Sequence, residues 1–240
     1  MIISHDLGTT GDKATLVDVD GRVVAADTAR YGTDFGTGGK AEQDPEAWWQ
    51  ALCEATHCLI GCVPRAAEKI AGVCFSGQMM GAVLLDNKAQ PVRPAIIWAD
   101  TRSTEQTTQL IERVGMDAAY KITGHRLDPT YSLEKIMWVR DNEPDVFART
   151  RHVVLAKDFM VHRLTGVLVT DPSDASGTNA FDQLGGTWSE ELLEAAFIDK
   201  SLLPEIVPST TVVGAVTPAA AAATVRPVAA GRKAADARRP

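Results

Sequence analysis

The sequence is poor in several features that would assign it to a particular class of protein. It has 240 residues, of which four are cysteine and 6% are aromatic, and no apolar run approaches the ~20 residues that a membrane helix needs. Acidic residues outnumber basic ones, and the net charge of -7 argues against a nucleic-acid surface. The N-terminus lacks the basic start and apolar run of a signal peptide. We therefore expect neither a membrane nor a nucleic acid as partner.

The few cysteines form no recognisable metal or disulfide framework. Cys58 and Cys62 are four residues apart and would share a helix face near His57, but this is not a known zinc spacing and no second ligand pair follows. A chain of this length can bury an apolar core without disulfides. We expect buried, reduced thiols at Cys53, Cys58, Cys62 and Cys74, which suits a cytoplasmic protein.

Three common signatures of nucleotide binding or hydrolysis are also missing. The Gly-x-x-x-x-Gly-Lys-Ser/Thr loop is absent, and Gly8 and Gly11 do not make the Gly-x-Gly-x-x-Gly fingerprint. No Gly-x-Ser-x-Gly elbow supports a Ser-His-Asp triad. P-loop, Rossmann and serine-hydrolase chemistry are therefore not indicated.

The residues that are present predict an α/β fold. Asp20-Gly21 lies between two β-rich runs and is a strong hairpin signal, so the chain should open with an antiparallel meander. Asp44 is placed to cap a helix that starts at Pro45. Strands and helices then alternate, which predicts a mixed sheet with flanking helices. The expected strands are Ile2–Leu7, Ala14–Val19, Arg22–Ala26, Ile70–Phe75, Ala82–Leu85, Ala95–Trp98 and His152–Leu155, and the expected later helices are Arg102–Val114, Leu133–Arg140, Lys157–Leu164 and Glu190–Phe197.

The segment Asp6–Lys13 is the first candidate for chemistry. An aspartate at the end of an apolar strand must be hydrogen-bonded or face a cleft, because a lone buried carboxylate is costly. The Gly-Thr-Thr-Gly turn after it offers N–H groups and hydroxyls that could surround phosphates, and Asp6 could hold magnesium through water. A plain hairpin turn with an aspartate cap explains the spacing equally well.

Two later segments also follow strands, where ligands of open α/β sheets gather. Ser76–Gly81 contains glycines around polar residues, although a tight turn whose methionines fill a core gap is the commoner structure. Trp98–Arg102 contains Asp100, which local evidence favours as the N-cap of the next helix. The residues alone leave both alternatives open.

Taken in order, these segments resemble the FGGY family of carbohydrate kinases, and within it the xylulokinases. Each motif is weak alone, whereas the ordered set is highly specific. The resemblance covers residues 1 to about 224 without a large gap. The matching stretches are Asp6–Lys13, Gln43–Trp49, Ser76–Asp86, Arg93–Arg102, Ser132–Arg140, Glu143–Thr150, Lys157–Gly166, Thr170–Phe181 and Val213–Thr224.

The resemblance implies an actin-like, ribonuclease H-like fold of two domains with a cleft between them. It also implies ATP and Mg²⁺ as cofactors and a small sugar as the other ligand. For intact family members, a homodimer is one possible assembly. Asp6 would lie in the catalytic and magnesium region. Gly8, Thr9, Thr10 and Lys13 would face the phosphates, and Gln78, Met79, Met80 and Asp100 would contact the sugar.

The sequence departs from the family pattern at two places. Many xylulokinases have histidine where this chain has Met80, so one polar contact to the sugar is lost. After Thr224 the family continues into a glycine-rich turn with the aspartate that serves as general base, and Asp236 does not match that setting. We expect residues 1–224 to form the N-terminal, sugar-side domain and residues 225–240 to be a disordered basic tail, with the second domain absent.

The expected family activity is ATP-dependent phosphorylation of a ketopentose, with D-xylulose as first choice. On this view the 240-residue chain is truncated and inactive. A kinase for ribulose, gluconate or glycerol is the alternative within the same class. A non-catalytic sugar-binding remnant and an actin-like ATPase without a sugar substrate are the alternatives outside it.

Overall fold

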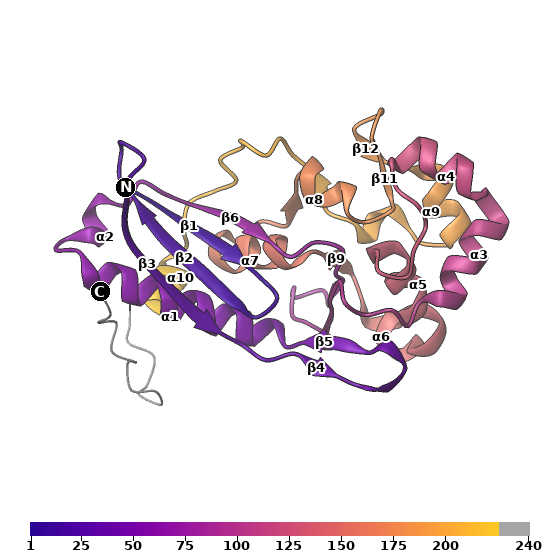
Figure 1. The fold of residues 1–240 in the computed structure, drawn as a ribbon, viewed down its shortest axis with the longest axis horizontal. Helices are drawn as coiled ribbons and strands as arrows, with labels where there is room; N and C mark the ends of the chain where they lie inside the picture. The colour runs from indigo at the N-terminus through magenta and orange to yellow at the C-terminus, as the bar shows by residue number, and fades with distance from the viewer. Residues whose placement is uncertain (226–240) are drawn as a thin grey trace, which may run out of the picture.

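A four-stranded mixed sheet forms one end of the molecule in the computed structural model, which describes residues 1–225 (Figure 1). The strands lie in the order β3-β2-β1-β6. β1 is antiparallel to β2, β2 is antiparallel to β3, and β6 is parallel to β1. Their bounds are β1 Ile2–Leu7, β2 Gly11–Val17, β3 Val23–Arg30 and β6 Gly72–Gly77. The opening meander and the mixed sheet are thus confirmed.

One face of this sheet is covered and the other is open. Strand side chains alternate between faces, so Ile3 and Leu7 are buried while Asp6 between them is exposed. Helix α1 (Pro45–Cys62) covers the inner face, with Trp48 and Leu52 buried. It begins as expected, because the Asp44 carboxylate accepts a hydrogen bond of 2.9 Å from the N–H of Glu46.

The rest of the chain continues away from the sheet as helices joined by short strand pairs (Figure 1). The remaining strands are β4 Asp34–Phe35, β5 Ala41–Gln43, β7 Val83–Leu85, β8 Ala95–Ile96, β9 His152–Val154, β10 Val169–Thr170, β11 Phe181–Asp182, β12 Thr187–Trp188 and β13 Glu205–Ile206. The remaining helices are α2 Ala66–Lys69, α3 Thr104–Val114, α4 Met116–Thr123, α5 Ser132–Asn142, α6 Pro144–Arg149, α7 Ala156–Thr165, α8 Pro172–Ser176, α9 Glu190–Ala196 and α10 Pro218–Val225. Single 3-10 turns occupy Thr37–Gly39 and Lys200–Leu202.

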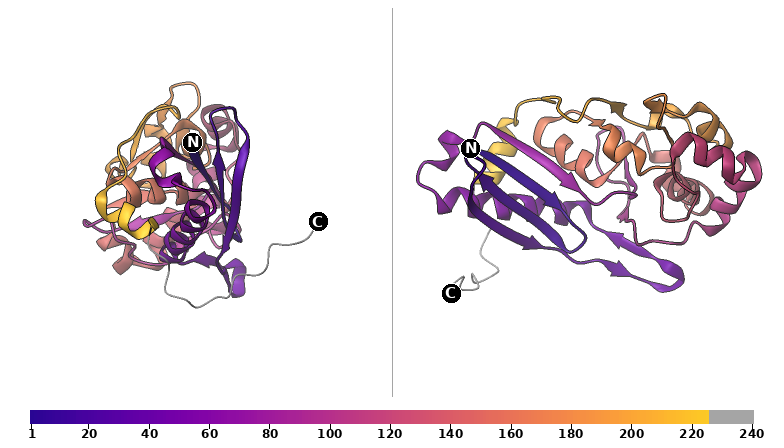
Figure 2. Two further views of the ribbon diagram at one scale, coloured as in Figure 1. Left: turned by 90° about the vertical axis from the view of Figure 1, so that its left-hand side faces the viewer. Right: turned by 45° about the horizontal axis from the view of Figure 1, so that its top comes forward.

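The buried apolar side chains form three clusters. Figure 2 shows the elements that carry them following one another from the sheet end to the helical end. The first lies between the sheet and α1 and includes Ile3, Leu16 and Leu59. The second joins α1 to α7 through Trp48 and Phe159. The third and largest fills the far end among α3, α5 and α9. The sheet end is therefore tied to the helical end through α1 and α7.

The expectation of four buried cysteines is wrong. Only Cys53 is buried, whereas Cys58, Cys62 and Cys74 are exposed as free thiols. Cys74 lies on β6 between Val73 and Phe75, and strand alternation turns it to the open face. Within residues 1–225 no group of His, Cys, Asp and Glu side chains could hold a metal ion by itself.

Within the same residues, no helix has the length and apolar character required to cross a membrane. The expected boundary at Thr224 falls one residue before the end of α10 at Val225. The predicted disordered tail, apart from Val225, lies outside the described residues.

Candidate active site

Asp6 lies at the end of the sheet where the parallel strands β1 and β6 both finish. It is in register with Lys13 on β2 and with Ser76 on β6, so the three side chains project from the same open face. The Ser76 hydroxyl donates a hydrogen bond of 3.2 Å to Oδ1 of Asp6. Lys13 is exposed and has no salt-bridge partner among the described residues. A carboxylate, an ammonium group and a hydroxyl thus stand side by side and face solvent.

The turn that joins β1 to β2 follows Asp6 directly. The N–H of Gly8 donates across the turn to the carbonyl of Gly11 at 3.0 Å, so it is engaged within the protein. The N–H groups of Thr9 and Thr10 make no hydrogen bond within the described residues. These two N–H groups are therefore the donors that the turn can offer to an anion, as backbone nests do.

Two aromatic side chains fix this turn from outside. The Tyr31 hydroxyl donates to the carbonyl of Gly8, and the Trp98 indole N–H donates to the hydroxyl of Thr9 at 2.9 Å. Burial raises the pKa of the Tyr31 hydroxyl, with the charge of Asp12 as the next cause, so it stays a neutral donor. The turn is thus held in one conformation before any ligand arrives.

Replacing Gly11 by alanine should distort this turn. The added Cβ would lie 2.5 Å from the carbonyl oxygen of Ala29 on β3, a backbone atom that cannot rotate away. We expect a loss of roughly 1–3 kcal/mol in the free energy of unfolding, measured by urea titration.

Gly61→Ala is the matched control, because Gly61 lies in α1 with nothing within 4 Å of its added Cβ. It should leave stability unchanged or raise it by up to ~1 kcal/mol through helix propensity. Equal effects at the two glycines would contradict the packing argument.

The segment after β6 carries the residues expected to contact the sugar. The N–H of Gln78 continues the ladder to the carbonyl of Leu7 at 2.8 Å. Met80 has φ 60°, a left-handed conformation that is costly for a side chain of this kind. The ammonium of Lys135 donates to the Met80 carbonyl at 2.7 Å. Burial lowers the pKa of Lys135 to about 7. The loop that contains Met79 and Met80 is therefore held from the helical side by α5.

Gln43 connects this loop to the turn that joins β1 to β2. The sequence did not single it out beyond its place in a matching stretch. It is 2% exposed, and its amide uses both donors and both lone pairs. The NH₂ group donates to the carbonyl of Thr9 at 2.6 Å and to the hydroxyl of Thr33 at 2.7 Å. Its oxygen accepts from the Trp48 indole at 2.9 Å and from the Gln78 amide at 2.8 Å. One buried side chain thus joins the two segments.

Asp100 has a different local role from the expected N-cap. Helix α3 begins at Thr104 after Ser103, so Asp100 does not cap it. Its carboxylate is 1% exposed and accepts from the N–H of Ala41 at 2.8 Å and from Nε of Arg102 at 2.9 Å. Asp100 is therefore engaged on both oxygens, since Oδ1 also accepts from Arg102. The capping interpretation is wrong because three residues lie between Asp100 and the first residue of α3, so Ser103 takes the N-cap position.

A second polar cluster lies at the start of α7 and was not predicted. Lys157 contacts three carboxylates, at 2.8 Å from Asp158, 3.2 Å from Asp171 and 3.4 Å from Asp174. Burial, and then the charge of Asp158, raises the pKa of Asp174 from its ordinary value of 3.8 to about 7. Three carboxylates around one lysine leave an excess of negative charge in a poorly hydrated place.

This cluster predicts a specific pH dependence of stability. The pKa of Asp174 is higher in the folded chain than in the unfolded chain. Its contribution to the free energy of unfolding is therefore fully present below about pH 4 and is lost as the pH rises through about 7. Urea titrations at pH 5 and pH 7.5 should therefore show a decrease in the free energy of unfolding. Asp174→Asn should reduce that decrease, whereas Asp117→Asn, at an exposed position on α4, should leave it intact. A decrease of the same size in all three proteins would exclude Asp174 as its source.

The residues at the sheet end fit a magnesium-bound nucleotide. In phosphate-transfer sites Mg²⁺ keeps several water ligands. Its other ligands are one or two carboxylates of the protein and the phosphate oxygens of the substrate. Asp6 is exposed, and within the described residues only Ser76 hydrogen-bonds its carboxylate. Asp6 could thus hold such an ion through water, and Lys13 and the turn N–H groups have the chemistry to donate to phosphate oxygens.

Known proteins of similar sequence and structure share this architecture. The chain is 38% identical over 223 residues to the xylulose kinase of Bacillus subtilis (strain 168), covering 93% of this chain and 44% of that protein. The solved xylulose kinase from Rhodospirillum rubrum has a TM-score of 0.89 at 31% identity, over 94% of this chain and 46% of that one. The solved gluconate kinase from Lactobacillus acidophilus has a TM-score of 0.87 at 29% identity, over 93% and 45%. The chain spans less than half the length of these relatives.

The family assignment rests on the whole described fold as well as on sequence. The family model for the N-terminal domain of the FGGY carbohydrate kinases matches residues 1–234. The solved relatives have the actin-like fold, which agrees with the mixed sheet and flanking helices seen here. The chain belongs to the FGGY family of carbohydrate kinases, of which it carries the N-terminal domain.

Proposed function

We propose that this chain supplies the sugar-side and phosphate-facing part of an ATP-dependent sugar kinase that acts on a ketopentose, with D-xylulose as first choice. The observation that carries the proposal is the alignment of Asp6, Lys13 and Ser76 on one open face, at the ends of β1 and β6. Gln43 ties this face to the loop of Gln78. A phosphate-facing turn and a sugar-facing loop are thus fixed together, as phosphoryl transfer requires.

Each assigned residue has a definite task in this proposal. In the reaction a sugar hydroxyl oxygen bonds to the γ-phosphorus of ATP, its proton passes to a general base that is not among the described residues, and the bond to the ADP oxygen breaks. Mg²⁺ would neutralise phosphate charge when bound. Asp6 would orient its water ligands, and Lys13 would offset negative charge on the phosphates. Gly8 allows the tight turn that presents the N–H groups of Thr9 and Thr10.

The sugar side rests on the loop after β6. Gln78 and Met79 follow the strand that contains Ser76, and Met80 is presented by its left-handed backbone. Asp100 would act by holding Arg102 and the N–H of Ala41, because both its oxygens are already engaged. Met80 offers no hydrogen bond to a sugar hydroxyl, so the loop supplies shape and apolar contact there.

We also propose that residues 1–224 act as one sugar-side domain. The exposed thiols of Cys58, Cys62 and Cys74 suit a reducing compartment, so we place the protein in the cytoplasm. The first proposal follows from the family assignment, and the second follows from the exposed, unpaired thiols.

A panel of sugars tests the substrate proposal. Isothermal titration calorimetry of the purified chain should give a higher affinity for D-xylulose than for D-ribulose, D-gluconate or glycerol. The same chain, fused after Thr224 to the C-terminal half of the Bacillus subtilis xylulose kinase, should release ADP from ATP when D-xylulose is present. The Asp6→Asn version of the fusion is the inactive control.

Gluconate kinase is the second candidate, because a gluconate kinase has nearly the same TM-score to this chain as the xylulose kinases. Binding and turnover confined to gluconate or glycerol would overturn the assignment to a ketopentose.

A further inference from the structure

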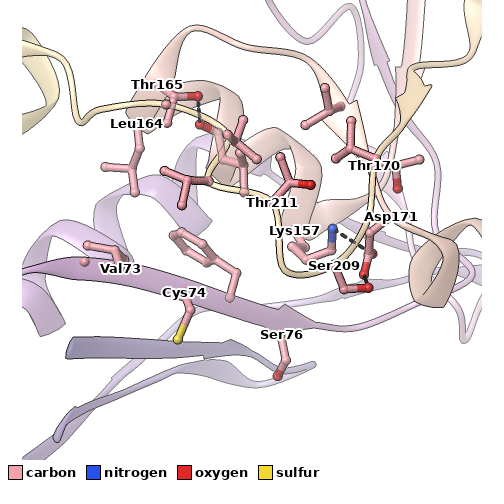
Figure 3. A pocket seen from close by; sticks show the side chains of 18 of the residues that line it. Val73, Cys74, Ser76, Lys157, Leu164, Thr165, Thr170, Asp171, Ser209 and Thr211 are labelled. Atoms are coloured by element: carbon pink, nitrogen blue, oxygen red, sulfur yellow. Dashed lines mark hydrogen bonds and ion pairs between the residues drawn. The ribbon is translucent and has the colours of Figure 1, made fainter. Parts of the chain in front are cut away.

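The segment Met79–Gly81 lies between Gln78, which still pairs with β1, and Ala82, which pairs with Ile96. We call this segment the methionine loop. Within the described residues its three N–H groups make no backbone hydrogen bond. On one side it borders a cavity of about 790 Å³ that runs alongside β6, and Met79 is among the residues that line it (Figure 3). The backbone of the loop is therefore fixed neither by its own N–H groups nor by packing on the cavity side.

The conformation of the methionine loop is nevertheless a demanding one. Met80 has φ 60°, where the Cβ of an L-residue crowds the backbone. Such a conformation persists only where the surrounding structure holds it, and it is a feature of ligand-binding segments.

Two side chains of α5 hold the carbonyl groups of this loop. The Lys135 ammonium donates to the carbonyl of Met80 at 2.7 Å, and the Ser132 hydroxyl donates to the carbonyl of Gly81 at 2.7 Å. Among the described residues these two carbonyls accept from no other donor. Lys135 and Ser132 are three residues apart in α5 and so lie on one face of the helix. Consecutive carbonyls of the loop are thus bound by one helix face.

Lys135 is suited to hold the loop and not to contact a ligand. Its side chain is 0% exposed, so it does not reach the surface at which a ligand binds. Its ammonium also donates to the carbonyl of Thr130, in the turn that precedes α5. A buried lysine is costly unless its donors are satisfied, so these bonds account for an ammonium where an apolar side chain would otherwise fit. One buried group thus joins the methionine loop to the turn before α5.

We propose that Lys135 and Ser132 are positioning residues for the sugar, which hold the methionine loop in the conformation that receives a ketopentose. This inference rests on the proposed function, which places the sugar against the loop. The two side chains act through the carbonyls of Met80 and Gly81. Without them the loop would populate other conformations, and the apparent affinity for the sugar would fall with the population of the competent one.

Two substitutions remove these donors one at a time. Lys135→Leu keeps nearly the volume of the side chain but lacks the ammonium, and Ser132→Ala removes only a hydroxyl. Calorimetry uses the ligand that the parent chain binds most tightly among D-xylulose, D-ribulose, D-gluconate and glycerol. Its Kd should rise at least about tenfold in Lys135→Leu and about threefold in Ser132→Ala. Lys121→Leu, at an exposed position of α4, is the matched control and should stay within about twofold of the parent.

A change at Met80 separates positioning from a general loss of packing. Asparagine adopts left-handed conformations more readily than methionine, so a Met80→Asn chain should depend less on Lys135. In the Met80→Asn background, Lys135→Leu should therefore raise the Kd by at most about threefold, against at least about tenfold in the parent. Equal factors in the two backgrounds would assign the effect to packing alone and would overturn the proposal.

NMR of the chain with methyl-labelled methionine observes the loop without any ligand. The Met80 signal is identified by its loss in Met80→Asn. It should shift or broaden in Lys135→Leu and in Ser132→Ala, and it should stay in place in Lys121→Leu. An unmoved Met80 signal in the folded variants would overturn the proposal whatever the sugar affinity, and Ser132→Ala decides alone if Lys135→Leu does not fold.

The same measurements distinguish this inference from the proposed function. A parent chain that binds none of the four ligands would overturn the proposed function and this inference with it. A parent that binds one of them as tightly as its folded Lys135→Leu and Ser132→Ala variants do would overturn the inference alone.

Discussion

Replacing Glu42 by alanine is expected to lower the free energy of unfolding by about 3 kcal/mol, because two largely buried guanidinium groups lose the carboxylate they share. The loss stays near the lower end of the usual range because Arg93 keeps Glu143 and Arg102 keeps Asp100. Glu42 is 5% exposed on β5. Its carboxylate accepts from Arg93 and, at 2.6 Å, from Arg102. Arg102 also stacks over the Trp138 ring, 4.2 Å from its centroid, and cannot swing out without losing that contact.

The effect of Glu42→Ala should extend to the candidate site as increased local mobility. Arg102 is the residue that engages both oxygens of Asp100, and Asp100 in turn binds the N–H of Ala41 beside Glu42. Loosening Arg102 therefore loosens the segment that carries Trp98, which donates to the turn at Thr9. We expect increased hydrogen exchange in both segments, measured by mass spectrometry below the unfolding transition.

Glu46→Ala is the matched control for Glu42→Ala. Glu46 accepts from Arg163 at 2.6 Å, which is the same distance as in the Glu42 pair, but its side chain is 49% exposed. Exposed pairs contribute about 0–1 kcal/mol, so urea titration should show little change. Comparable losses in the two variants would show that burial is not what makes the Glu42 pair important.

The sequence predicted the sheet end of the fold because its signals there are local. Asp20-Gly21 marks the second hairpin, and Asp44-Pro45 marks the start of α1, and both act within a few residues. The strands β1 and β6 were recognised from short apolar runs. Their adjacency was not predicted from these runs, because parallel pairing joins residues about seventy positions apart.

Short helices at the far end escaped prediction for a related reason. α4 begins directly after Gly115, whose φ of 84° ends α3, so one glycine separates two helices. α6 begins at Pro144, separated from the end of α5 by Glu143 alone, and it has no buried residue of its own. Neither helix has an apolar pattern long enough to identify it.

The candidate site was predicted only in part. Asp6, Lys13 and Ser76 occupy matching positions on adjacent strands, so strand-end reasoning brings Asp6 and the Ser76 loop together. The Lys157 cluster was missed, because its three carboxylates come from two segments that only the packing of α7 and α8 brings together. A cluster of this kind has no local signature.

Gln43 likewise has no local signature in the sequence, because its partners come from distant segments. Its replacement by leucine should have the second large effect on the free energy of unfolding. Leucine has nearly the volume of glutamine but neither donates nor accepts. The substitution would leave the Trp48 indole, the Thr9 carbonyl and the Gln78 amide without their partner in a buried place. Each unsatisfied group costs about 1–3 kcal/mol, and partial relaxation of the two loops offsets some of this, so we expect a loss of roughly 2–4 kcal/mol.

Three variants together separate a general loss of stability from a loss of coupling between the two segments. Gln50→Leu makes the same chemical change at an exposed position of α1 and should stay within about 0.5 kcal/mol of the parent in urea titration. Gln43→Glu keeps an acceptor for Trp48 and Gln78 but places a second acceptor against the Thr9 carbonyl. Hydrogen exchange should then rise at the turn of Thr9 in Gln43→Glu, and at both the turn and the Gln78 loop in Gln43→Leu. An equal rise at both places in Gln43→Glu would show that the two segments move together for reasons other than this one amide.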